Sequence, residues 1–213
     1  IEKKLKDDLA KRFSFSVLFF YQKEAEGTAH AIYCAKKILK GRVMVVFSDT
    51  LFFLKNKVNV LNQNNDGVIL VKSVKDPTQY GVITTDEKEI VTSFIEKPKK
   101  PKSNLAIIGV YVFRDGAALL KEIQKILVAK QKEKNEYQLT TALINLMDSG
   151  SRFQAVRVQD WLDCGTPEQI LLTNSYLLNK KKVKKRLAKT SNTKIIQPVY
   201  IGKNTIIKNS TIG

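Results

Sequence analysis

The sequence predicts an α/β protein with a mainly parallel central sheet flanked by helices. Three observations support this fold class. Short apolar runs that suit strands alternate along the chain with longer segments that suit helices. The run over residues 43–47 is continuously apolar and rich in valine, which is typical of a parallel strand buried on both faces. Glycine or proline stands at the ends of several expected helices, where these residues commonly mark a boundary.

The first part of the chain is expected to contribute two helices and two strands. In order, they are a helix over residues 1–12, a strand over 16–21, a helix over 29–39 and a strand over 43–47. Gly27 and Thr28 open the second helix and Gly41 ends it. Asp49 follows the second strand directly. Because open α/β sheets bind ligands at the carboxyl ends of their strands, Asp49 occupies a candidate site.

The middle of the chain is expected to form most of the sheet and two helices. The elements are a strand over residues 68–74, a hairpin of strands 82–84 and 90–96, a strand over 105–113, helices over 116–130 and 137–148, a strand over 154–158 and a helix over 168–178. Asp76 and Pro77 mark a turn, and Pro98 marks a loop. Gly150 ends one helix and Pro167 begins another.

The C-terminal stretch changes in character. Its isoleucines recur at or near six-residue spacing, at positions 195, 201, 207 and 212, with small polar residues between them. This rhythm is typical of a β-helix, of which about one coil is present. One coil cannot bury its own faces, so further chain, the main domain or a partner subunit must cover it. The predicted organisation is a main domain over residues 1–178, a basic linker over 179–194 and the β-helix start over 195–213.

The net charge of +17, from 37 Lys and Arg against 20 Asp and Glu, invites a nucleic-acid interpretation. Two details weaken it. Only six of the 37 basic residues are arginine, which supplies most base-edge recognition. Residues 180–213 hold ten basic residues and no acidic one, so much of the excess is local. We therefore expect no nucleic-acid partner.

Other protein classes are excluded by composition. With 43% hydrophobic residues the chain suits a packed core rather than disorder. Two cysteines and one histidine are too few for a disulfide framework or a multi-histidine metal site. Apolar runs fall well short of the roughly 20 residues that a spanning helix requires. We expect a cytoplasmic protein with no membrane partner.

Six segments of the chain carry a recognisable pattern: Gln22 with residues 27–31, residues 45–49, residues 80–82 with 96–98, residues 103–113, residues 135–140 and residues 161–166. In this order they resemble motifs of the sugar-1-phosphate nucleotidylyltransferases. The likeness covers about residues 1–178, and the C-terminal stretch is similar to the left-handed β-helix that many members carry. The forms of two motifs look closest to glucose-1-phosphate thymidylyltransferases and N-acetylglucosamine-1-phosphate uridylyltransferases.

The resemblance implies a Rossmann-like fold of the nucleotide-diphospho-sugar transferase type and a specific reaction. A nucleoside triphosphate, UTP or dTTP, would join a 1-phosphate of glucose or N-acetylglucosamine and release pyrophosphate. A sugar phosphate oxygen attacks the α-phosphorus in line, so catalysis depends on positioning and on neutralising phosphoryl charge. Mg²⁺ is the implied cofactor, and a homo-oligomer formed through the β-helix of the full-length chain is the implied assembly.

The resemblance also implies roles for particular residues. Catalysis would use Asp49 and Asp163, which would bind the Mg²⁺, and Lys97, which would pair with the sugar phosphate. The remaining candidates fall into two groups. The nucleotide-binding candidates are Gln22, Gly27 and Thr28, and the sugar-binding candidates are Gly81, Glu96 and Asn104.

Each candidate also has a purely structural interpretation. Asp49 suits a turn or a helix cap after a strand, and Asp163 suits a cap for the helix that follows it. Glu96, Lys97 and Pro98 suit a solvated turn. Gly27 suits a loop that needs an unusual backbone conformation. His30 suits packing better than metal binding.

The sequence departs from the family pattern in one major respect. The family's glycine-rich loop, which wraps the triphosphate, belongs upstream of Gln22, and no glycine precedes Gln22 here. We expect an N-terminally incomplete enzyme that is inactive as this piece; the alternative is a non-catalytic regulatory or assembly subunit with the same fold. Ser48, Thr141 and Asp160 are smaller departures. A longer chain with more coils would also be compatible with an acetyltransferase activity.

Overall fold

The computed structural model describes residues 2–14, 16–55, 65–180 and 189–213. Contacts divide the chain into two compact units. Unit 1 comprises Ile1–Val45 and Val58–Arg157, and unit 2 comprises Val46–Lys57 and Val158–Gly213. Half of the expected basic linker, residues 181–188, lies outside the described residues. The described residues contain no helix that is both long and apolar enough to cross a membrane.

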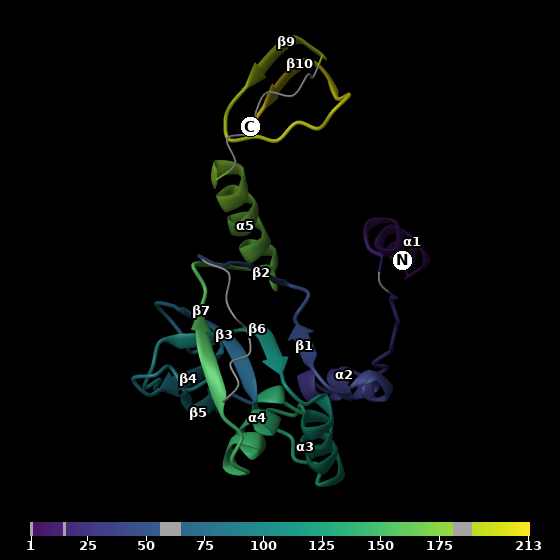
Figure 1. Ribbon diagram of the computed structural model, residues 1–213. Coiled ribbons are helices and arrows are strands. Elements are labelled where there is room, and N and C mark those ends of the chain that lie inside the picture. Colours follow the sequence, from purple (N-terminus) through teal and green to yellow (C-terminus); the bar gives the residue numbers. More distant parts are fainter. Residues whose placement is uncertain (1, 15, 56–64, 181–188) are drawn as a thin grey trace. The chain divides into compact units, whose positions relative to one another are not determined.

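Unit 1 is built around a six-stranded sheet (Figure 1). Its strands are β1 (Val43–Val46), β3 (Gly67–Ser73), β4 (Gly81–Thr85), β5 (Val91–Glu96), β6 (Leu105–Phe113) and β7 (Phe153–Arg157). The order is β5-β4-β6-β3-β7, with β1 also paired to β6. Strand β6 is buried along its whole length and forms the centre of the core.

The sheet is mixed, so the prediction of a mainly parallel sheet is wrong. Strands β3 and β7 run parallel, whereas the pairs β3–β6, β4–β5 and β4–β6 are antiparallel. The physical reason is the connections. Between β3 and β6 the chain passes through a turn, the β4–β5 hairpin and a loop, without the crossover helix that usually joins parallel neighbours.

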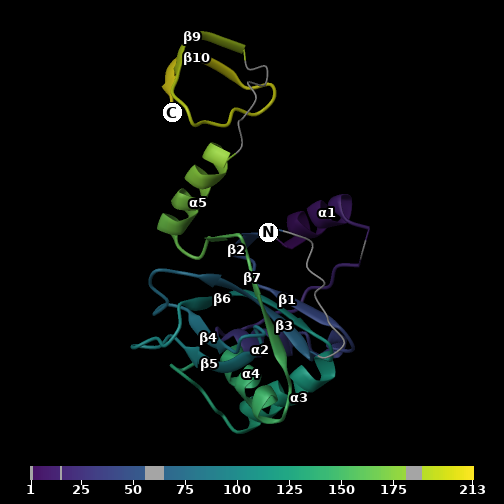
Figure 2. The same ribbon diagram turned by 60° about the vertical axis from the view of Figure 1, so that its left-hand side comes forward.

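Helices cover one side of the unit 1 sheet. They are α2 (Thr28–Cys34), α3 (Gly116–Val128) and α4 (Leu139–Asp148), and they lie together in both views (Figures 1 and 2). Leu119 of α3 and Leu143 of α4 are fully buried. The ring of Phe153 on β7 contacts those of Phe94 and Phe113 edge-on, at centroid distances of 5.9 and 6.3 Å.

Most predicted elements of unit 1 are confirmed, and three differ. Helix α1 (Glu2–Arg12) lies where the sequence places it. The expected strand over residues 16–21 is wrong, because its described residues join no strand ladder. The expected helix over residues 29–39 breaks at Ala35 into α2 and the short 3₁₀ helix η1 (Lys36–Ile38). Strand β1 is not buried on both faces, since Met44 and Val46 are about half exposed.

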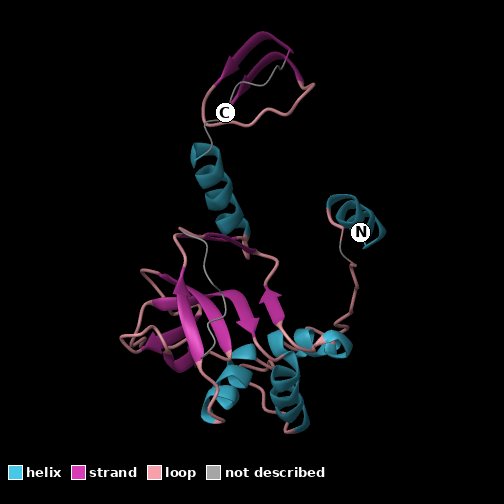
Figure 3. Ribbon diagram, viewed as in Figure 1, coloured by secondary structure: helices cyan, strands magenta, loops and turns pink. Residues whose placement is uncertain are grey.

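The described residues of unit 2 form two small sheets and one helix, and Figure 3 distinguishes these strands and this helix by colour. Strands β2 (Thr50–Phe53) and β8 (Asp160–Asp163) pair antiparallel, and α5 (Pro167–Lys180) follows β8. Strand β2 was not predicted, because it is four residues long and follows another apolar run. Strands β9 (Lys189–Ile195) and β10 (Ile206–Ile212) run parallel, with Lys189 beside Ile206. The left-handed β-helix itself stays a prediction.

Candidate functional site

Asp49 and Asp163 are brought together in unit 2. Residues Thr50 and Asp163 are partners in the β2–β8 pair, and the Cys164 amide donates a 2.8 Å hydrogen bond to the Asp49 carbonyl. Both carboxylates approach Gly165. A Cβ atom added there would lie 3.1 Å from Asp163 Oδ1 and 3.4 Å from Asp49 Oδ2. Two residues that are 114 positions apart in the chain therefore present their carboxylates to one point.

Local hydrogen bonds hold the Asp163 carboxylate in place. The Gly165 amide donates to Oδ1 and the Gln169 side-chain amide donates to Oδ2, each at 2.8 Å. Asp163 is half-buried and Asp49 is exposed. The capping interpretation of Asp163 is wrong, because its carboxylate accepts from the turn residue Gly165 and from a side chain, whereas the Thr166 hydroxyl accepts the Gln169 amide of α5 at 3.3 Å. Each carboxylate oxygen of Asp163 has a second lone pair, so these hydrogen bonds leave capacity for a cation.

The donor chemistry of the pair fits Mg²⁺. Mg²⁺ prefers oxygen ligands and commonly takes one or two carboxylates together with substrate phosphates and water. Within the described ranges, no group of three or more His, Cys, Asp or Glu side chains is arranged to hold a metal. A two-carboxylate site of this kind does not need such a group. Asp49 and Asp163 are therefore the residues that would hold the ion.

Gly81 and Glu96 are brought together in unit 1. They are partners in the β4–β5 hairpin, and a Cβ atom added to Gly81 would lie 3.1 Å from Glu96 Oε2. The hydroxyl of Thr140, on α4, donates a 2.7 Å hydrogen bond to the same oxygen. Burial, aided by the negative charge of Glu96, raises the pKa of the Tyr111 phenol. The Glu96 carboxylate thus lies beside Gly81 of β4, which has no side chain there, and accepts a hydrogen bond from Thr140, a buried residue of α4.

Lys97 and Asn104 flank this group differently. Lys97 is exposed and has φ of +44°, and its amide donates to the Tyr80 carbonyl at 3.1 Å. The Lys134 ammonium donates to the Lys97 carbonyl at 3.4 Å. These contacts fix the Lys97 backbone and leave its side chain exposed. Asn104 is also exposed, and its carbonyl accepts from the Val74 amide.

The nucleotide-binding candidates form a second cluster in unit 1. The Gln22 side-chain amide donates to the Gly27 carbonyl at 3.0 Å and lies 3.1 Å from His30 Nδ1. The other ring nitrogen of His30 lies 3.4 Å from Glu26 Oε2. Both ring nitrogens of His30 therefore face polar side chains of this loop. His30 therefore braces the loop, as the packing interpretation predicts.

Gly27 and Thr28 are held against the segment that precedes α4. Gly27 has φ of +104°, and a Cβ atom there would lie 2.6 Å from the Tyr137 carbonyl oxygen, closer than real Cβ atoms come. The Ala29 amide donates to that oxygen at 2.9 Å, and the Leu139 amide donates to the Thr28 hydroxyl at 2.9 Å. Only glycine fits at position 27, because the segment around Tyr137 occupies the space where a Cβ atom would lie.

Three residues of these groups were missed as candidates. Thr140 and Tyr137 lie in the motif over residues 135–140, and Gly165 lies in the motif over residues 161–166. The motifs were the available signal. Nothing in the local sequence shows that Thr140 contacts Glu96, which is 44 residues away in the chain.

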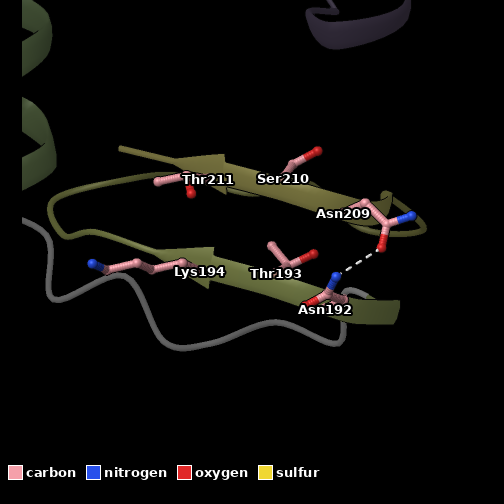
Figure 4. A pocket seen from close by; sticks show the side chains of 6 residues that line it. All are labelled: Asn192, Thr193, Lys194, Asn209, Ser210 and Thr211. Carbon is pink, nitrogen blue, oxygen red and sulfur yellow. Dashed lines mark hydrogen bonds between the residues drawn. The ribbon is translucent and has the colours of Figure 1, made fainter.

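A further surface pocket of about 400 Å³ lies on β9 and β10 (Figure 4). Asn192 donates to Asn209 across the two strands at 3.1 Å. None of the predicted site residues lines this pocket. Its lining residues are Asn192, Thr193, Lys194, Asn209, Ser210 and Thr211.

Comparison with protein families gives one broad match. The family described as Nucleotidyl transferase matches residues 2–180. This range includes every predicted site residue and ends before β9.

Characterised proteins of this kind are similar over most of the chain. The low-salt glycan biosynthesis nucleotidyltransferase Agl11 of Haloferax volcanii is 30% identical over 82% of this chain and 49% of its own length. The bifunctional protein GlmU of Methanocaldococcus jannaschii is 32% identical over 77% of this chain and 38% of its own length. The glucose-1-phosphate thymidylyltransferase of Streptomyces antibioticus is 27% identical over 94% of this chain and 57% of its own length. The chain thus spans about half the length of the curated relatives it matches.

Solved structures share the fold. A nucleoside-diphosphate-sugar pyrophosphorylase from Vibrio cholerae has a TM-score of 0.66 at 16% identity, covering 80% of this chain and 74% of its own. A UDP-glucose pyrophosphorylase complexed with UDP-glucose has a TM-score of 0.66 at 20% identity, covering 84% of this chain and 73% of its own. At these identities the likeness concerns the fold alone.

Proposed function

Because the chain belongs to the nucleotidyl transferase family, we propose that the protein forms a nucleoside diphosphate sugar and pyrophosphate from a nucleoside triphosphate and a sugar 1-phosphate. The observation that carries the proposal is the approach of Asp49 and Asp163 to Gly165. Two carboxylates presented to one point suit a Mg²⁺ that is shared with substrate phosphates.

We propose UTP or dTTP as the nucleotide and glucose or N-acetylglucosamine 1-phosphate as the sugar. The names of similar proteins support these classes, since they include a glucose-1-phosphate thymidylyltransferase and a UTP–glucose-1-phosphate uridylyltransferase. An adenylyltransferase at 28% identity is also among them, so assays should include ATP.

In the proposed reaction a phosphate oxygen of the sugar 1-phosphate attacks the α-phosphorus of the nucleotide. A new P–O bond forms, and the bond to the pyrophosphate leaving group breaks. Lys97 balances the charge of the sugar phosphate. Asp49 and Asp163 would hold Mg²⁺, which when bound neutralises charge on the phosphates.

The other candidates bind and orient the substrates. Glu96 accepts hydrogen bonds from sugar hydroxyls, and Gly81 and Asn104 complete the sugar site. Gln22, Gly27 and Thr28 hold the nucleotide. Their hydrogen bonds to each other and to residues 137–139 support a rigid binding loop. Rigid positioning is the main catalytic resource in phosphoryl transfer.

The β9–β10 pair supports a further part of the proposal. Parallel strands whose partners are 17 residues apart suit one coil of a left-handed β-helix. We propose that this coil continues in the full-length protein and forms the subunit contact of a cytoplasmic homo-oligomer.

The test is pyrophosphate release by the full-length protein with Mg²⁺, each nucleotide and each sugar 1-phosphate. We expect Asp49→Asn and Asp163→Asn each to lower kcat on the order of a hundredfold to a thousandfold, because each removes charge at the phosphates. Glu87→Gln is the matched control, since Glu87 is an exposed carboxylate at a hairpin tip. Full activity in both aspartate variants would refute the proposal. A full-length protein that releases no pyrophosphate but binds a related subunit would instead support the regulatory alternative.

A further inference from the structure

We propose that Thr140 is a positioning residue for Glu96, and that it thereby sets the affinity for the sugar. This inference rests on the proposed function, because it assumes that Glu96 binds sugar hydroxyls. It adds a residue outside the predicted site, on a different element from Glu96. Thr140 belongs to α4, whereas Glu96 ends β5.

The Oε2 atom of Glu96 has a defined hydrogen-bond partner. The Thr140 hydroxyl donates its single proton to Glu96 Oε2 at 2.7 Å. The same oxygen lies beside Gly81, where an added Cβ atom would be 3.1 Å away. Thr140 therefore holds Oε2, and the missing side chain of Gly81 leaves space beside it. Oε1 makes no hydrogen bond to the described residues of the protein and is the oxygen left for a ligand hydroxyl.

The residues near the Glu96 carboxylate are buried. Thr140 is 5% exposed and Tyr111 is also 5% exposed. Glu96 contributes to raising the pKa of the Tyr111 phenol, which places its charge close to a buried aromatic residue. Glu96 itself is half-buried, so the carboxylate is partly shielded from water, and a hydrogen bond to a charged oxygen is stronger than one between neutral groups. Thr140 thus restricts a side chain that otherwise has several rotatable bonds.

Hydrogen bonds fix the backbone that leads to Thr140. Residue Leu139 donates its amide to the Thr28 hydroxyl, and the Tyr137 amide and carbonyl bond to Glu26 and Ala29. The backbone leading to Thr140 is therefore fixed before α4 begins. A hydroxyl on a fixed backbone orients its partner better than one on a mobile loop.

The experiment compares Thr140→Val with Thr140→Ser in the full-length protein. Valine keeps the shape and removes the donor, and serine keeps the donor. Isothermal titration with the sugar 1-phosphate and steady-state kinetics would give Kd and KM. For Thr140→Val we expect both to rise about tenfold to a hundredfold for the sugar 1-phosphate, with the KM for the nucleotide unchanged. Thr140→Ser should restore most of the affinity.

The control is Thr141→Val. Thr141 is the buried neighbour of Thr140, and its side chain leaves the helix about 100° away. We expect its sugar affinity to stay near that of the wild type, which separates loss of the hydrogen bond from general damage to α4.

Each outcome separates the two proposals. If the wild-type protein binds no sugar 1-phosphate, both the proposed function and this inference are overturned. If the wild type binds it and Thr140→Val binds equally well, only the positioning role is overturned. Equal losses in Thr140→Val, Thr140→Ser and Thr141→Val would likewise overturn the positioning role, because they would trace the loss to the helix.

Discussion

At the scale of single residues, the side chain of Asp163 shapes its own turn and also approaches Asp49. Its two oxygens accept hydrogen bonds from Gly165 and Gln169, as a structural aspartate would. Both carboxylates nevertheless approach Gly165, as metal ligands would. A residue with two acceptor oxygens fills both roles, because each oxygen has more than one lone pair.

Gly27 is the residue whose substitution we expect to be most damaging to the nucleotide loop. In Gly27→Ala the new Cβ would meet the Tyr137 backbone, which Ala29 and Glu26 hold in place. We expect a loss of about 2–4 kcal/mol in the free energy of unfolding, from backbone strain and overpacking together. Urea denaturation would measure it.

Gly41→Ala is the matched comparison for this prediction. Gly41 also has positive φ, at +59°, but no atom lies within 4 Å of its added Cβ. It should cost only about 1 kcal/mol, the typical penalty for a left-handed alanine. Equal losses at the two positions would contradict the proposed close approach at Gly27.

Tyr111 leads to a prediction about pH. Burial, with help from Glu96, raises the pKa of its phenol, whereas in the unfolded chain the phenol titrates near about 10. The unfolded chain therefore releases the proton first. The associated stability is fully present below pH of about 10 and is lost as the pH rises further, by up to about 1.4 kcal/mol per pH unit.

Urea denaturation of the wild type and Tyr111→Phe between about pH 8 and pH 11 would check this prediction. The other titrating groups are shared, so they cancel in the difference. We expect a constant difference in the free energy of unfolding at the lower pH values and a shrinking one above pH of about 10. Parallel profiles over the whole range would contradict the raised pKa.

At the scale of elements, helix ends and hairpins follow the sequence closely. The β4–β5 hairpin is formed as predicted, and it sets Gly81 opposite Glu96. Helix α5 begins at Pro167, and its last residue, Lys180, bonds to Asp160 of β8 at 2.8 Å. This hydrogen bond raises the pKa of Lys180. Local sequence determines the hairpin and the start of α5 because the interactions that form them are local, whereas the Lys180–Asp160 bond joins residues that are 20 positions apart.

Helix α3 offers a test of this local determination. The Asp115 side chain accepts a hydrogen bond from the Ala117 amide at 2.9 Å and caps the helix. We expect Asp115→Ala to lower the free energy of unfolding by about 1 kcal/mol, because a helix amide loses its acceptor. Asp148→Ala, at the C-terminal end of α4, should be neutral or slightly stabilising, since an acidic residue is unfavourable there. Thermal or urea denaturation of both variants would decide, and equal losses would contradict the capping role.

Elements that depend on distant partners were predicted less well. The apolar run over residues 16–21 resembles a strand, yet no strand of the described chain pairs with it. Strand β2 has only four residues and exists through its pairing with β8, more than 100 positions later. Strand formation requires a partner, and the identity of the partner is not contained in a local window.

At the scale of the whole molecule, the nucleotidyl transferase family covers residues 2–180, which include both members of the carboxylate pair and the whole unit 1 sheet. Residues of the predicted site belong to both units. Asp49 and Asp163 lie in unit 2, and Lys97, Glu96 and Gln22 lie in unit 1.

Short segments of the sequence predict most of the helices, the β4–β5 hairpin, the family and the candidate residues, because periodicity, caps and ordered motifs are local properties. The folded structure adds that the sheet is mixed, that Asp49 and Asp163 both approach Gly165, and that the Thr140 hydroxyl donates a hydrogen bond to Glu96. Each of these depends on contacts between positions far apart in the chain. Strand direction and side-chain contact arise only when the chain closes on itself, since no local preference specifies which distant segment becomes the neighbour.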